Sequence, residues 1–195
     1  FAAWAAWVLD INGLDTVALL DGGRRKWEAE GGPLSAEAAT PEPGDVTLAE
    51  RDLSIRARLG DVLEASASGS HHIVDIRSPK EFSGELIAPE GIKELAIRAG
   101  HVPGAINAPW GVAVAEDGTF KSPEALRAIY ADLGIDGSKP VITYCRIGER
   151  SSHTWFALSK LLGYDVKNYD GSWTEYGNAV GVPIANPALT VWTGQ

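Results

Sequence analysis

The chain has 195 residues and a net charge of −9, with 26 acidic against 17 basic side chains. This acidic balance argues against a nucleic-acid-binding surface and against an anionic membrane as partners. No apolar run approaches the length of a membrane span, and the single cysteine cannot form an internal disulfide, which fits a reducing, cytoplasmic compartment. The apolar fraction of 45% is sufficient for one large or two small folded domains.

The N-terminal segment resembles a later part of the same chain. Residues 17–27 align with residues 166–176, and each segment is expected to follow a helix that ends at a glycine, Gly13 or Gly163. Each is also expected to continue into a short helix. A repeated order of elements indicates a duplicated unit, whereas a chance similarity between two strand–turn–helix units is the alternative.

We therefore predict two unequal parts. Residues 1–33 are interpreted as the last helix, strand and helix of an upstream domain, with the apolar helix at residues 1–9 buried. Residues 34–45 are rich in Ala, Glu, Pro and Gly, a composition typical of a linker. The second domain is expected at residues 46–187, and residues 188–195 form a tail.

The second domain alternates expected strands and helices in chain order. Ser78 and Ser172 each begin a sequence typical of a helical capping box. This alternation predicts an α/β fold with a central parallel sheet and helices on both faces, whose sites collect at the carboxyl ends of the strands. Strands are expected at residues 46–48, 73–76, 105–108, 141–144 and 166–169, and helices at 58–67, 78–81, 123–132, 150–162 and from 172 onward.

Cys145 lies between the end of an expected strand and the start of an expected helix. Backbone N–H groups and the positive end of the helix dipole converge on such a position. Gly148 supplies a flexible turn, and Arg146 and Arg150 add two cations, an environment that favours the reactive thiolate. Cys145 is therefore the candidate nucleophile, although many free cysteines only fill a core.

Three separated motifs resemble the rhodaneses, or thiosulfate sulfurtransferases. Residues 75–84 (DIRSPKEFSG) resemble the first signature segment of that family, and residues 100–107 (GHVPGAIN) resemble the second. Residues 145–151 (CRIGERS) resemble the active-site loop, and residues 170–173 (DGSW) resemble a turn near that loop. The likeness is greatest to the two-domain form, in which the upstream domain lacks the catalytic cysteine. On this resemblance, residues 1–33 are expected to be the incomplete remnant of that upstream domain.

The resemblance implies a double displacement without a metal or an organic cofactor. Cys145 would take the outer sulfur of thiosulfate, or of a similar anionic donor, and release sulfite. The resulting persulfide would pass its sulfur to a thiol or to cyanide. The four histidines have no carboxylate or cysteine at ligand spacing, so no metal site is expected. The expected substrate-binding residues are Arg146, Gly148, Arg150 and Arg77, and those expected to support the loop are Asp75, Ser151 and Trp173.

Several of these residues have a structural alternative. Asp75 and Arg77 are as well placed for an ion pair that steadies a loop as for direct substrate contact. Trp173 is suited to packing beneath the active-site loop. Glu81 is expected as a capping partner, at a place near which some family members have a substrate-binding arginine. Residues 85–99 are long for a connection and are expected at the rim of the pocket.

Three other functions remain as alternatives. A 3-mercaptopyruvate sulfurtransferase is disfavoured because such enzymes tend to carry small residues after the cysteine, where this chain has Arg146. A non-enzymatic sulfur carrier would hold a persulfide and release it slowly. A cysteine phosphatase needs five residues between Cys and Arg, but that arginine position is Ser151, and Arg150 comes one residue early.

Overall fold

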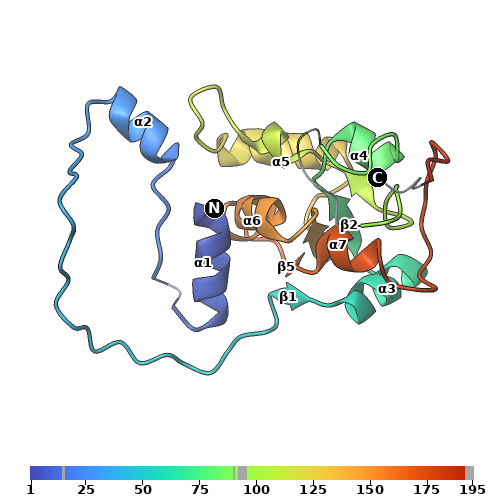
Figure 1. The fold of residues 1–195 in the computed structure, drawn as a ribbon, viewed down its shortest axis with the longest axis horizontal. Helices are drawn as coiled ribbons and strands as arrows, with labels where there is room; N and C mark the ends of the chain where they lie inside the picture. The colour runs from blue at the N-terminus through green and yellow to red at the C-terminus, as the bar shows by residue number, and fades with distance from the viewer. Residues whose placement is uncertain (15, 90, 92–95, 192–195) are drawn as a thin grey trace.

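The computed structural model describes the whole chain except residues 15, 90, 92–95 and 192–195 (Figure 1). The described residues form a parallel sheet of five strands in the order β1-β5-β4-β2-β3. The predicted α/β fold with a central parallel sheet is thus confirmed. The strands are β1 (Arg56–Ala57), β2 (His72–Asp75), β3 (Ile106–Asn107), β4 (Val141–Tyr144) and β5 (Val166–Tyr169).

Helices follow the strands and pack on the two faces of the sheet. A π-helical segment, η2 (Phe156–Leu161), directly continues α6, and a short 3₁₀ helix, η1 (Trp110–Ala113), follows β3. The α-helices are α1 (Ala2–Ile11), α2 (Gly23–Ala29), α3 (Leu59–Ser68), α4 (Pro79–Ser83), α5 (Pro123–Asp132), α6 (Glu149–Trp155) and α7 (Ser172–Tyr176).

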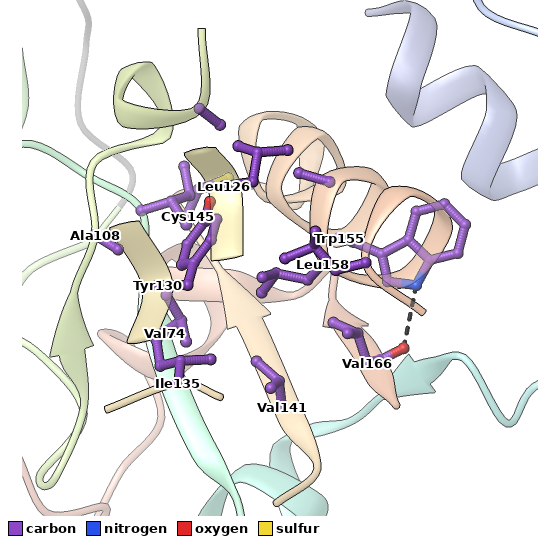
Figure 2. Packing of buried hydrophobic residues seen from close by; sticks show 14 of the residues in the cluster. Val74, Ala108, Leu126, Tyr130, Ile135, Val141, Cys145, Trp155, Leu158 and Val166 are labelled. Atoms are coloured by element: carbon purple, nitrogen blue, oxygen red, sulfur yellow. Dashed lines mark hydrogen bonds between the residues drawn. The ribbon is translucent and has the colours of Figure 1, made fainter. Parts of the chain in front are cut away.

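Alternate residues of the central strand β4 belong to two different hydrophobic clusters, as the period of two in a strand requires. Val141 packs in one cluster with residues of α5, α6 and η2, such as Leu126 and Leu158. Ile142 packs in the other with residues of α3, β2 and α7. Figure 2 shows the first cluster, with Cys145 beyond the end of β4 and Trp155 donating to the Val166 carbonyl. Cys145 therefore directly follows the central strand β4, whose four residues are all buried.

Most predicted elements form where the pattern places them. Helix α5 occupies Pro123–Asp132, and Ser78 caps α4 in a capping box with Glu81. The predicted strand at residues 46–48 is wrong, because this exposed segment is irregular and the first strand begins at Arg56. Residues 46–48 therefore run outside the sheet.

The first copy of the predicted repeat is only partly reproduced. Its short helix forms as α2, but residues 17–20 form no strand. A strand needs a neighbour for its backbone N–H and C=O groups, and these residues pair with no other strand in the part of the chain that the structure describes. The turn and helix of the repeat are thus present without the strand.

The predicted burial of the N-terminal helix is confirmed for one of its faces. Helix α1 lies beside α6 (Figure 1), and its buried residues are Ala3, Ala6, Trp7 and Ile11. The Trp7 Nε1 group donates to the Ile55 carbonyl at 3.2 Å. Trp4, one turn before Trp7, is 41% exposed. No helix among the described residues is long and apolar enough to cross a bilayer.

We predict that Trp7→Ala lowers the free energy of unfolding by about 3–5 kcal/mol, because the substitution leaves a cavity between α1 and α6 and removes an indole hydrogen bond. Trp4→Ala is the matched control on the same helix and should cost less than about 1 kcal/mol. Urea denaturation followed by circular dichroism measures both. Equal losses in the two variants would contradict the packing of α1.

Candidate active site

The Cys145 loop joins the carboxyl end of β4 to α6 and is shaped by Gly148. Gly148 has a φ of +84° and precedes the first residue of α6. A Cβ atom at this position would lie 2.5 Å from Asp170 Cα, so only glycine permits so close an approach. The loop can therefore approach the turn after β5 closely. The first N–H groups of α6, like those of any helix, have no intrahelical partners.

The turn after β5 holds the loop from the other side. The Cys145 N–H donates to Ser172 Oγ at 3.1 Å, and the Trp173 N–H donates to the Cys145 carbonyl at 3.0 Å. The Ser172 hydroxyl, 4.0 Å from Cys145 Sγ, donates to the Tyr169 carbonyl. The predicted capping box at Ser172 is wrong, because this hydroxyl contacts the cysteine loop instead of its own helix. Ser172 thus lies beside Cys145. It belongs to the segment at residues 170–173, which resembles a turn near the active-site loop of the rhodaneses.

Asn168, which sequence reasoning missed, connects β5 to the start of α6. Its Nδ2 donates to the Gly148 carbonyl at 3.1 Å and to Ser152 Oγ at 3.0 Å. Its Oδ1 accepts from Ser151 Oγ at 2.6 Å. All three side chains are buried. The only signal in the sequence was a polar residue within a buried strand, where an unpaired amide would be costly. Ser151 is therefore tied to β5 through Asn168, and its support of the loop stays a prediction.

Asp75 and Arg77 form a buried ion pair beneath this region. Arg77 Nη2 is 2.6 Å from Asp75 Oδ2 and 2.7 Å from the Gly100 carbonyl oxygen. Burial by itself lowers the pKa of Arg77, but the adjacent Asp75 carboxylate outweighs this effect and raises it. The guanidinium lies 4.6 Å from the ring of Trp173, which is itself fully buried. This arrangement favours the ion-pair alternative over direct contact of Arg77 with a substrate.

The two loop arginines have different surroundings. Arg146 is buried, and its carbonyl accepts from the Thr174 N–H at 2.9 Å. Arg150 Nη2 lies 3.4 Å from Glu81 Oε1, and the Arg150 side chain is 30% exposed. Cys145 itself has no exposed surface. Of the two loop cations, Arg150 is the more accessible to a ligand in solution.

A cavity of about 420 Å³ lies between α1 and the first turn of α6. Its walls include the aromatic residues Phe1, Trp110 and Phe120, together with Arg150 and His153. The cavity lies where the N-terminal segment meets the rest of the chain. The predicted pocket rim at residues 85–99 falls partly outside the described residues, at 90 and 92–95.

The histidines near the site are structural in their contacts. His101 Nδ1 is 2.7 Å from the Phe82 carbonyl oxygen. His153 stacks on Phe120 with ring centroids 4.3 Å apart, and burial lowers its pKa to about 4. Within the described ranges, no group of three or more His, Cys, Asp or Glu side chains is arranged to hold a metal ion.

Comparison with known proteins connects this geometry to sulfur chemistry. The model of the rhodanese-like domain matches residues 59–179. A protein of Mycolicibacterium smegmatis named "Putative thiosulfate sulfurtransferase" is 55% identical over 94% of this chain and 66% of its own length. The sulfur carrier protein TtuD of Thermus thermophilus is 55% identical over 95% of this chain and 67% of its own. The chain thus spans about two thirds of the length of these relatives.

A solved structure gives the same fold. It is a variant of EanB with a cysteine persulfide, in a tetrahedral intermediate state with ergothioneine. It matches with a TM-score of 0.83 and 26% identity, over 95% of this chain and 45% of that chain. The match extends beyond residues 59–179 and so includes the N-terminal segment.

We predict that Asn168→Ala lowers the free energy of unfolding by about 2–3 kcal/mol, because it leaves the buried Gly148 carbonyl and the Ser151 hydroxyl without this partner. Asn12→Ala is the matched control. Asn12 makes an exposed bond to the Val8 carbonyl, and its loss should cost under about 1 kcal/mol. Thermal and urea unfolding of both variants decide the outcome, and similar small losses would argue against the network.

His153 makes stability depend on acid. Its pKa is about 4 in the folded protein and 6.5 in an unfolded chain, so the unfolded state binds the proton more readily. The free energy of unfolding should therefore decline as the pH falls from about 6.5 to 4, by up to about 3 kcal/mol. Urea titrations across this pH range test the decline. His153→Phe should flatten the profile in this window, and an unchanged slope would contradict the assignment.

Proposed function

The chain belongs to the rhodanese family, and we propose that it moves the outer sulfur of thiosulfate to a thiophilic acceptor through a persulfide on Cys145. The observation that carries this proposal is the placement of the unique thiol. Cys145 follows the central strand β4 and faces the turn that begins α6, within a loop fixed on both sides by hydrogen bonds. Such a loop suits a negatively charged sulfur, because preorganised N–H groups stabilise an anion without rearranging.

The proposed reaction has two displacements. The Cys145 thiolate attacks the outer sulfur of thiosulfate, the S–S bond of the donor breaks, and sulfite leaves with the bonding electron pair. The acceptor, a thiolate or cyanide, then attacks the outer sulfur of the persulfide. This step yields an acceptor persulfide or thiocyanate and returns the Cys145 thiolate. Neither step needs an external oxidant or reductant.

The loop residues divide the work in this proposal. The N–H groups of the first turn of α6 receive the persulfide charge, and Gly148 gives the loop the backbone conformation that this requires. Arg150, at the wall of the cavity, attracts the anionic donor. Arg146 is the second cation that binds the donor, and Ser151 and Trp173 support the loop from β5 and the turn after it.

A sulfur carrier is the second candidate, and the likeness to TtuD supports it. A carrier would form the same persulfide but release its sulfur to a partner protein faster than to a small acceptor.

3-Mercaptopyruvate remains the alternative donor, and kcat/KM for thiosulfate and for 3-mercaptopyruvate shows which donor the protein prefers. A phosphatase is disfavoured, since the position that needs arginine is Ser151, whose hydroxyl is buried against Asn168.

We further propose that residues 1–33 belong to an upstream domain, joined by the linker at 34–45 to the catalytic domain at 46–187. Two contacts support it. The buried face of α1 packs on α6, and Asp21 accepts a hydrogen bond from the Phe120 N–H across the junction. The free thiol that the reaction needs suits a reducing compartment such as the cytoplasm.

We predict that Cys145→Ala abolishes sulfite release from thiosulfate and leaves the fold intact, because no other thiol exists in the chain. Steady-state assays with cyanide as acceptor measure the loss, and circular dichroism confirms folding. Ser159→Ala, on the outer part of η2, is the control and should retain full turnover. Folded Cys145→Ala protein with more than a few per cent of parent activity would rule out the covalent mechanism.

A further inference from the structure

Glu81 is a buried carboxylate of the first signature segment that contacts the first turn of α6. It is 1% exposed and belongs to α4. Its Oε2 accepts from the Ser78 N–H at 3.0 Å and from Ser78 Oγ at 2.9 Å, which completes the capping box. Its Oε1 is directed toward Arg150 Nη2, 3.4 Å away. One carboxylate thus serves a helix cap and an ion pair at the same time.

The helix cap does not require the negative charge. A glutamine in the third position of a capping box accepts the same hydrogen bonds as a glutamate. A buried carboxylate is also costly unless it is paired. Arg150 is paired with the Oε1 atom of Glu81, so a consequence of the charge is expected at that guanidinium.

Arg150 contacts Glu81 and also borders the cavity beside α1. It lies in the first turn of α6, and its partly exposed side chain also lines the 420 Å³ cavity. An anion that enters beside Arg150 therefore meets a cation whose charge is already offset by a carboxylate. Because that carboxylate is shielded from water, its field at the cavity is screened less than the field of a surface charge.

We propose that Glu81 is a positioning and specificity-determining residue of the sulfur-transfer site. It holds the Arg150 guanidinium against α4 and offsets its charge, so that dianions bind only weakly. This role rests on the proposed function. It affects the binding of both the donor thiosulfate and the product sulfite, which compete for the Arg150 guanidinium. The buried carboxylate favours release of sulfite over tight binding of the donor, and leaves the persulfide accessible to a monoanionic or uncharged thiol.

The test compares Glu81→Gln with two other variants. Glu81→Gln keeps the cap and removes the charge, whereas Ser78→Ala weakens the cap and keeps the charge. Glu81→Gln should lower both the KM for thiosulfate and the inhibition constant for sulfite by roughly fivefold, without a rise in kcat. Ser78→Ala should leave both constants near the parent values while it lowers the melting temperature. In the double variant Glu81→Gln/Arg150→Gln, which removes both charges, both constants should lie closer to the parent values than in Arg150→Gln alone.

A second readout does not depend on turnover. Inorganic sulfate, an unreactive dianion, should protect Cys145 from iodoacetamide at a concentration roughly fivefold lower in Glu81→Gln than in the parent. In Arg150→Gln alone, the unpaired Glu81 carboxylate should repel sulfate and weaken protection by at least about tenfold. That variant decides the matter if Glu81→Gln fails to fold.

The outcomes are separable. Unchanged sulfate protection in folded Glu81→Gln, or in Arg150→Gln, overturns the inference. A double variant in which sulfate protects no better than in Arg150→Gln also overturns it, because the Glu81 carboxylate would then exert no charge effect at the site. A parent protein that releases no sulfite refutes the proposed function, and the protection measurements still decide the role of Glu81.

Discussion

The Gly148 carbonyl, at the point where the Cys145 loop becomes α6, accepts hydrogen bonds from Asn168 Nδ2 and from the Ser152 hydroxyl. A buried carbonyl without partners would cost about 1–3 kcal/mol, so this end of the helix is fixed relative to β5. The Ser172 hydroxyl fixes the cysteine end of the loop in the same way, through the Cys145 N–H. Both anchors come from β5 and the turn after it. The position of the thiol relative to the first N–H groups of α6 therefore depends on the pairing of β4 with β5.

Two buried acids organise the other side of the site. Asp75, at the end of β2, is paired with Arg77, whose guanidinium also lies against Trp173 beneath the loop. Glu81, a few residues later, reaches Arg150 on α6. The first pair lies within the signature segment, and Arg77 also donates to the Gly100 carbonyl, whereas the second pair joins that segment to α6. Removing one partner of either pair would leave an uncompensated buried charge.

The sequence predicted those elements whose local chemistry and tertiary environment agree. Helix α5 begins after Ser122 as its cap predicts, and the β-branched residues 141–143 form the central strand. Residues 17–20 and 46–48 have apolar side chains typical of strands, but strand formation also needs a neighbouring strand. Ser172 has a capping-box sequence, yet its φ of +51° and its bond with Cys145 arise from the fold of the turn. Likewise, the link between Asn168 and Gly148 spans 20 residues and has no local pattern.

The central claim is that this scaffold holds a persulfide on Cys145. Mass spectrometry of the intact protein and of its peptides, after brief treatment with thiosulfate and rapid desalting, tests it most directly. The account predicts the added mass of one sulfur atom on the peptide that contains Cys145, and the loss of that mass on exposure to cyanide. Protein that remains unmodified by thiosulfate, or that carries the added sulfur on a peptide without Cys145, would contradict the account.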